Sequence, residues 1–103
     1  MKNETVSSEV DTATVQTEGD LVAAKLPVLR SRLRAMVDLG IRHLTLDLVL
    51  TKMVDSAGIG LLIAAHNSLK KAGGELTVIH ASNDILELFR TMRIQQHFNV
   101  SGS

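Results

Sequence analysis

The sequence lacks several residue types that many functional classes require. Its 103 residues contain no cysteine, tryptophan or tyrosine, and only one proline and two phenylalanines. The absence of cysteine excludes disulfide frameworks, thiol nucleophiles, zinc fingers and iron–sulfur sites, and it suits a reducing cytoplasm. With so few aromatic rings, the chain offers no stacking platform for single-stranded nucleic acid.

The chain also lacks an excess of charge and a long apolar run. Eleven Lys and Arg balance eleven Asp and Glu, which disfavours nucleic-acid binding through a basic face. The apolar run over residues 57–65 is far shorter than the roughly 20 residues of a membrane-spanning helix. Residues 1–9 are polar and do not resemble a signal peptide, so we expect a flexible tail, followed by a single domain over 10–103 in a cytoplasmic protein.

The sequence does contain alternating strand and helix patterns. Residues 10–17 are rich in β-branched side chains and predict a first strand, alternating leucines over 43–49 predict a second, and Leu76, Val78 and Ile79 mark a third. A short edge segment is expected near residues 98–100. Between the strands, apolar residues at helical spacing predict a helix that starts near Pro27 and ends at Gly40, and another over about 57–72.

A third helix is expected to begin at a cap formed by Ser82 or Asn83, with Ile85, Leu88, Phe89 and Met92 facing inward. Strands that alternate with helices predict an α/β fold with a mostly parallel or mixed four-stranded sheet and helices packed against it. Sites in such sheets lie at the carboxyl ends of the strands, which places residues 50–60 at the expected site.

The segment over 47–60, DLVLTKMVDSAGIG, has two interpretations. Asp55 and Ser56 are good helix N-cap residues, and spacing alone favours a purely structural capping role. Alternatively, Ser56 is a phosphorylation site at a helix start, where free N–H groups and the helix dipole tolerate a phosphate.

Three motifs resemble the STAS domain of bacterial anti-sigma factor antagonists. They are Leu44-Thr-Leu-Asp-Leu through Val54-Asp-Ser-Ala-Gly-Ile-Gly, then Lys70-Lys-Ala-Gly-Gly-Glu-Leu, and finally Ile85-Leu-Glu-Leu-Phe. The resemblance covers residues 14–100 and favours Ser56 as a phosphorylated residue. It implies a non-catalytic, partner-switching module that binds a serine kinase or anti-sigma factor of the histidine-kinase-like ATPase class. A metal-dependent serine phosphatase would reset it.

The chain departs from the family pattern at three places. Ala57 stands where a second Ser or Thr is usual, which leaves Ser56 as the single acceptor in the motif. Val22 lies near a position that is often Asp, and Arg93-Ile94 replaces a common Gly-Leu. These changes affect the expected partner surface more than the expected switch.

Other functional classes fit less well. A serine hydrolase elbow would need glycine two residues before Ser56, where Val54 stands. A receiver domain needs paired acids after its first strand, where this chain offers only Glu18 and Asp20 around Gly19. Nucleotide binding is disfavoured because the chain has neither a Gly-x-Gly-x-x-Gly motif nor a P-loop. The four histidines have no metal-ligand spacing, and Asp47 is expected to orient the loop that follows its strand.

The sequence therefore predicts a cytoplasmic regulator with no cofactor, no metal, no nucleic-acid partner and no membrane insertion. Asp55 is expected to orient the loop and assist kinase recognition, while Gly58 and Gly60 allow close approach of the partner and tight helix packing. The second hypothesis is a constitutive STAS scaffold subunit of a larger signalling or transporter complex, without a phosphorylation cycle. The residues expected to bind the partner are Asp20, Lys52, Met53, Asp55, Ser56, Ala57 and Gly58.

Overall fold

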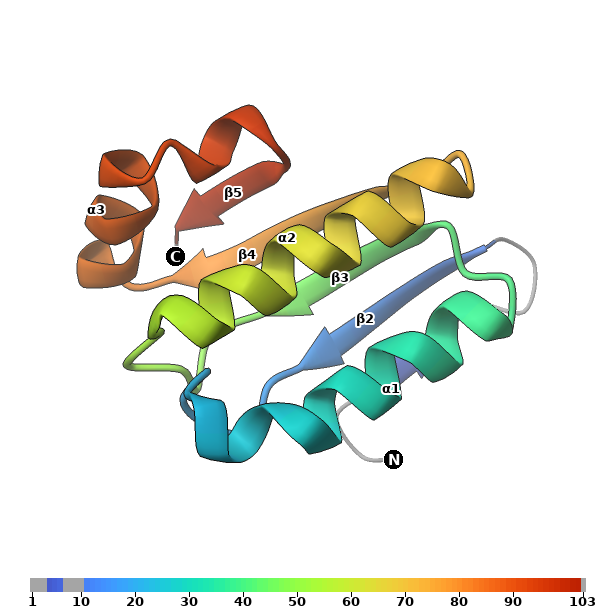
Figure 1. Cartoon of the computed structure of the whole chain (residues 1–103), viewed down its shortest axis with the longest axis horizontal. Helices are drawn as coiled ribbons and strands as arrows, with labels where there is room; N and C mark the ends of the chain where they lie inside the picture. Colours follow the sequence, from blue (N-terminus) through green and yellow to red (C-terminus); the bar gives the residue numbers. More distant parts are fainter. Residues whose placement is uncertain (1–3, 7–10, 103) are drawn as a thin grey trace.

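The computed structural model describes residues 4–6 and 11–102 (Figure 1). Strands and helices alternate along the chain. Their bounds are β1 (Glu4–Val6), β2 (Thr12–Gln16), η1 (Ala23–Lys25), α1 (Leu26–Asp38), β3 (His43–Asp47), α2 (Ser56–Lys71), β4 (Glu75–Ala81), α3 (Asn83–Thr91), η2 (Ile94–Gln96) and β5 (Asn99–Gly102).

The strands form one sheet in the order β1-β2-β3-β4-β5. The four strands β2 to β5 are parallel to one another, which confirms the predicted α/β class. The edge strand β1 pairs with β2 in the antiparallel direction, with Thr5 opposite Thr14. Residues 4–6 are therefore part of the sheet, whereas we expected a tail over 1–9. The other residues of that tail, and residue 10 of the first predicted strand, lie outside the described residues.

Helices α1 and α2 lie side by side across one face of the sheet (Figure 1). Helix α1 has Pro27 in its first turn and ends before Gly40, whose φ of +95° suits only glycine without strain. Every second residue of β2, of β3 and of β4 as far as Val78 is buried, so these strands alternate between core and surface. The core-facing side chains of the three strands are Ala13, Val15, Leu44, Leu46, Leu76 and Val78.

The outer face of the sheet is polar apart from Ile79 across β2, β3 and β4. Thr14, Thr45 and Thr77 form a row across β2, β3 and β4, and each is half-buried. Parallel sheets are usually apolar on both faces because helices cover both of them. The alternation seen here follows from having α1 and α2 on the same side.

In the carboxyl-terminal part, the buried stripe of α3 differs from prediction at its last position. Ser82 is the N-cap of α3 and accepts a hydrogen bond from the Ile85 N–H at 3.2 Å. Ile85 and Phe89 are buried as expected, but Met92 is 46% exposed. The helix ends at Thr91 and the chain turns at Arg93, whose φ is +56°, so Met92 leaves the buried stripe.

Candidate functional site

Ser56 is the first residue of α2 and its side chain is exposed, at the end of the sheet where the strands reach their carboxyl ends. The N-cap of the helix is Asp55, whose Oδ1 accepts a hydrogen bond from the Gly58 N–H at 2.8 Å. Capping and modification were alternative interpretations of this segment. The structure assigns the cap to Asp55, so the hydroxyl of Ser56 is not used in it.

The second oxygen of Asp55 joins α2 to a neighbouring loop. Oδ2 accepts a hydrogen bond from the Ala23 N–H at 3.0 Å, and the Asp55 N–H donates to the Leu21 carbonyl at 3.1 Å. The Gly58 and Ala23 N–H groups lower the pKa of the Asp55 carboxyl. Asp55 thus stays ionised at neutral pH and holds the start of α2 against residues 21–23.

Asp20 makes the reciprocal connection from the other loop. Its Oδ1 accepts hydrogen bonds from the N–H groups of Lys52 at 2.9 Å and Met53 at 3.1 Å. The Lys52 N–H makes the largest contribution to lowering the pKa of this carboxyl. Leu21 also donates to the Met53 carbonyl at 2.9 Å. Both predicted partner-binding carboxylates therefore tie together the two loops, which we call the loop clasp (residues 17–25 and 48–55).

Two buried threonines connect the two loops of the loop clasp, and the sequence patterns did not indicate either of them. Thr17 and Thr51 are buried, and their hydroxyl groups are hydrogen-bonded to each other. The Thr51 hydroxyl also lies 2.8 Å from the Gly19 carbonyl, to which it donates. A lone threonine at a loop position has no distinctive spacing, so only the folded chain reveals this pair.

The end of β3 is held by Asp47, as predicted. Its Oδ1 accepts a hydrogen bond from the Val49 N–H at 3.0 Å and lies 2.8 Å from Nδ1 of His80 at the end of β4. His80 has a φ of +58°, in the left-handed region that non-glycine residues seldom adopt. Because its carboxylate contacts both the Val49 N–H and His80, Asp47 fixes the start of the loop that follows β3.

Several large apolar side chains are exposed in the loop that precedes Ser56. Val49 and Leu50 are each 53% exposed and Met53 is 58% exposed, while Val54 is buried. Lys52 and Ala57 are also exposed. A cluster of large exposed apolar side chains on a loop is typical of a protein contact surface.

The two glycines of the motif have different surroundings. Gly58 is buried, and a Cβ added to it would lie 2.3 Å from the Leu21 carbonyl oxygen and 2.9 Å from the Val54 side chain. Gly60 is exposed, with no atom within 4 Å of such a Cβ. Gly58 therefore serves the packing of α2 against the loop clasp.

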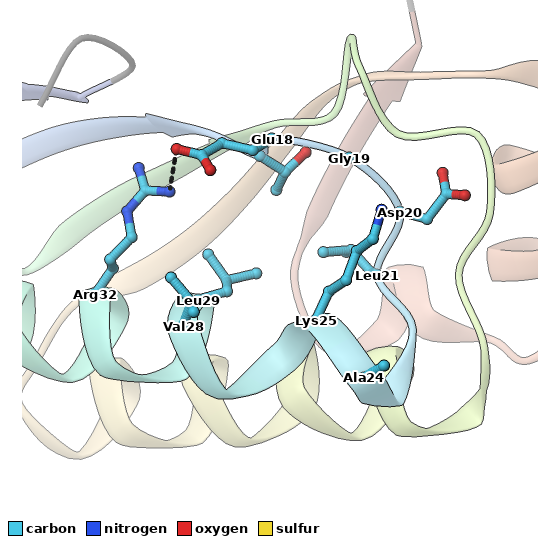
Figure 2. Close-up of a pocket in the computed structure, with 10 residues that line it drawn as sticks. Glu18, Gly19, Asp20, Leu21, Ala24, Lys25, Val28, Leu29 and Arg32 are labelled. Atoms are coloured by element: carbon cyan, nitrogen blue, oxygen red, sulfur yellow. Dashed lines mark ion pairs between the residues drawn. The ribbon is translucent and has the colours of Figure 1, made fainter.

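A cavity of about 400 Å³ opens beside the loop clasp, between residues 17–21 and the start of α1 (Figure 2). Arg32 forms an ion pair with Glu18 at 3.8 Å across it. The Asp20 carboxylate is turned toward the neighbouring loop, where it accepts its two hydrogen bonds (Figure 2). Within the described ranges no group of three or more His, Cys, Asp or Glu side chains could hold a metal ion.

The chain belongs to the STAS domain family. Residues 4–100 match the family model described as "Mlab, STAS domain". Across residues 4–6 and 11–102, no helix is long and apolar enough to span a membrane.

Solved structures share the fold at low sequence identity. The protein TM1081 of Thermotoga maritima is 11% identical, with a TM-score of 0.87 over 97% of this chain and 85% of that one. An anti-sigma factor antagonist from Mycobacterium paratuberculosis is 19% identical, with a TM-score of 0.81 over 97% of this chain and 85% of that one. The phosphorylated form of the Bacillus cell fate determinant SpoIIAA is 14% identical, with a TM-score of 0.70 over 94% of this chain and 89% of that one.

Proposed function

We propose that this chain is an anti-sigma factor antagonist-like regulator whose binding to a serine kinase is switched off by phosphorylation of Ser56. The observation that carries the proposal is the exposed Ser56 side chain at the start of a helix that Asp55 already caps. Modification there leaves the cap in place, so the fold is retained while the surface changes charge. The kinase would be of the histidine-kinase-like ATPase class, and a metal-dependent phosphatase would reverse the change. In this cycle the chain binds and does not catalyse.

The effect of a phosphate follows from its neighbours. It would add a charge of about −1.5 to −2 next to the ionised Asp55. The Gly58 N–H, one of the donors at the start of the helix, is already engaged by Asp55. The new charge would therefore face the partner. Weakening binding from micromolar to millimolar requires only about 4 kcal/mol, within reach of one buried, uncompensated charge.

The contact surface that we propose is the exposed part of the segment around Ser56. Val49, Leu50 and Met53 supply apolar area, and Lys52 and Ala57 complete it. A phosphate amid these side chains would keep water bound where the partner must exclude it. Phosphorylation would thus act through desolvation as well as repulsion.

Intact-mass measurement of the protein isolated from its own cells tests the modification. We expect a population that is heavier by one phosphate and that disappears in Ser56→Ala. Ser68→Ala, which changes another exposed serine of α2, is the matched control and should keep that population. Affinity purification then tests the switch, because Ser56→Ala should retain the kinase that Ser56→Asp loses.

The scaffold hypothesis makes the opposite prediction. Its support is the exposed apolar cluster, which could hold a permanent partner without any modification. A wild-type protein without phosphate, together with equal partner capture by wild type and Ser56→Asp, would refute the switch and favour a constitutive subunit.

A further inference from the structure

A second groove lies away from Ser56, between the helices α1 and α2 that run side by side in Figure 1. It has a volume of about 350 Å³. Its floor is apolar and includes the buried side chains of Leu33, Leu61 and Leu69. The groove exists because α2 contributes only small side chains to one wall: Ala64, Ala65 and Ser68.

The other wall of this α1–α2 groove carries charge. Arg30 and Arg34 are exposed on α1, one helical turn apart, and both line the groove. Neither has an ion-pair partner within the described ranges. Arg32, between them in sequence, instead pairs with Glu18 beside the first cavity. One further turn along, Asp38 adds a single negative charge at the end of the groove.

These features define the chemistry of an occupant. An apolar trough between two helices fits one apolar face of an amphipathic helix, whose side chains repeat every three to four residues. Arg30 and Arg34 fit two carboxylates that are also one turn apart, and Asp38 fits a basic side chain one turn beyond them. The rest of the groove wall is uncharged, so the positive pair sets the complementary sign.

We propose that the α1–α2 groove is a docking site for an acidic amphipathic helix of a partner protein. This surface goes beyond the switch proposed at Ser56. It begins at Leu61, on the body of α2, whereas Ser56 lies at the first residue of that helix. The chain would therefore hold one partner in the groove while it exchanges another at the loop clasp.

Two synthetic amphipathic peptides test the proposal. Both carry leucines at helical spacing; one has a pair of glutamates one turn apart followed by a lysine, and the other has these charges inverted. In NMR titrations of the full-length protein we expect the acidic peptide to shift the amide signals of Val37, Ala64 and Ser68. Fluorescence anisotropy should show that it binds at least about tenfold more tightly than the inverted peptide.

Charge reversal on the protein makes the test specific. Arg30→Glu/Arg34→Glu should reduce the affinity for the acidic peptide at least about tenfold and increase that for the inverted one. Lys70→Glu/Lys71→Glu causes the same change in net charge outside the groove lining and should preserve the preference. Ser56→Asp should also leave peptide binding unchanged, which separates this proposal from the switch.

Several outcomes would overturn the proposal. These are no binding of the acidic peptide up to millimolar concentration, equal binding of both peptides, or an unchanged preference in Arg30→Glu/Arg34→Glu. Binding of laurate to the same amides, at concentrations where the acidic peptide has no effect, would assign the groove to an acyl chain. Concentration-dependent shifts of those amides without peptide, with dimers in sedimentation, would assign it to a second copy of the chain.

Discussion

The loop clasp and the carboxyl-terminal part of the chain differ in whether the polar side chains packed there form hydrogen bonds. In the loop clasp, Asp20, Asp55 and Thr51 each accept from or donate to backbone groups of the facing loop. Where α2 meets the carboxyl-terminal part, the buried His66 of α2 packs near His97 and Phe98, and its Nδ1 has no hydrogen-bond partner among the described residues. His80 and Arg93, which flank α3, are the non-glycine residues with positive φ in the described part of the chain.

This difference shows which part of the chain is held in a fixed conformation by hydrogen bonds. The proposed switch, in which one hydroxyl is presented to a partner enzyme, requires fixed loops, and charged hydrogen bonds to backbone N–H groups fix them strongly. The carboxyl-terminal part serves mainly to close the core, where apolar burial can offset an unpaired nitrogen and a strained backbone. Four substitution experiments can break or sharpen this contrast.

The largest effect is expected at Gly58. Gly58→Ala would place a Cβ 2.3 Å from the Leu21 carbonyl oxygen, and we expect a loss of about 3 kcal/mol in the free energy of unfolding, because backbone must move. Gly60→Ala, two residues along the same helix, should gain about 0.5–1 kcal/mol, since alanine favours a helix over glycine. Urea denaturation measures both. Equal effects would show that α2 does not depend on close contact with the loop clasp.

Acid should loosen the loop clasp. The folded-state pKa values of Asp20 and Asp55 are lowered by backbone N–H groups. Their contribution to stability is thus present above the usual Asp pKa near 4, and it is lost as the pH falls through the lowered folded values. Stability measured from pH 7 to pH 2 should fall less steeply in Asp20→Asn/Asp55→Asn, from a lower starting value.

The exposed Asp38 provides the control for this acid experiment. Asp38→Asn should retain the acid slope of the wild type. The same slope in Asp20→Asn/Asp55→Asn would mean that the two carboxylates do not secure the loops.

A smaller pH effect is expected at His66, where α2 packs against the carboxyl-terminal part. Burial lowers the pKa of His66, and the charges of Lys70 and His97 add to this shift. The contribution of neutral His66 to stability should be fully present above the usual His pKa near 6.5. It should decrease as the pH is lowered from there through the lowered folded pKa. His66→Phe is expected to flatten the dependence of stability on pH between about pH 6.5 and 5. A wild-type curve that is already flat would contradict this account.

The smallest effect is expected at Arg93. Its φ of +56° costs a non-glycine residue about 1 kcal/mol, part of which Arg93→Gly should recover. Arg93→Ala keeps the unfavourable conformation and should gain nothing. Thermal unfolding of the two variants would show whether strain is present, because a stability of Arg93→Gly at or below that of Arg93→Ala would exclude it.

Local patterns predicted most of the elements because their causes are local. Apolar spacing located α1 and α2, Pro27 and Gly40 marked where α1 starts and ends, and Ser82 was among the two expected caps. Met92 was misjudged because helical spacing does not reveal where a helix ends. Arg93 adopts a left-handed conformation that glycine normally adopts. The residue type did not predict the turn, although Arg93-Ile94 replaces a Gly-Leu that is common in the family pattern.

The candidate site was located by its motif but was only partly understood from it. Ser56 stood out because the motif around it resembles that of the STAS domain, whereas spacing alone favoured a structural cap. The position of Asp47 at its strand end suggested a loop-orienting role. The partners of Asp20 lie 32 and 33 residues away, and the Thr17–Thr51 pair spans 34 residues. No spacing rule within a segment can detect bonds of that range.

The sequence by itself determined the succession of strands and helices and the position of Ser56 at the start of α2, because periodicity and caps act within a few residues. Tertiary structure alone decided that β1 joins the sheet, that Asp55 reaches across to Ala23, and that Asp20 reaches across to residues 52 and 53. These outcomes depend on which strands and loops become neighbours. That choice is made when the chain buries its core as a whole, after local preferences have been satisfied.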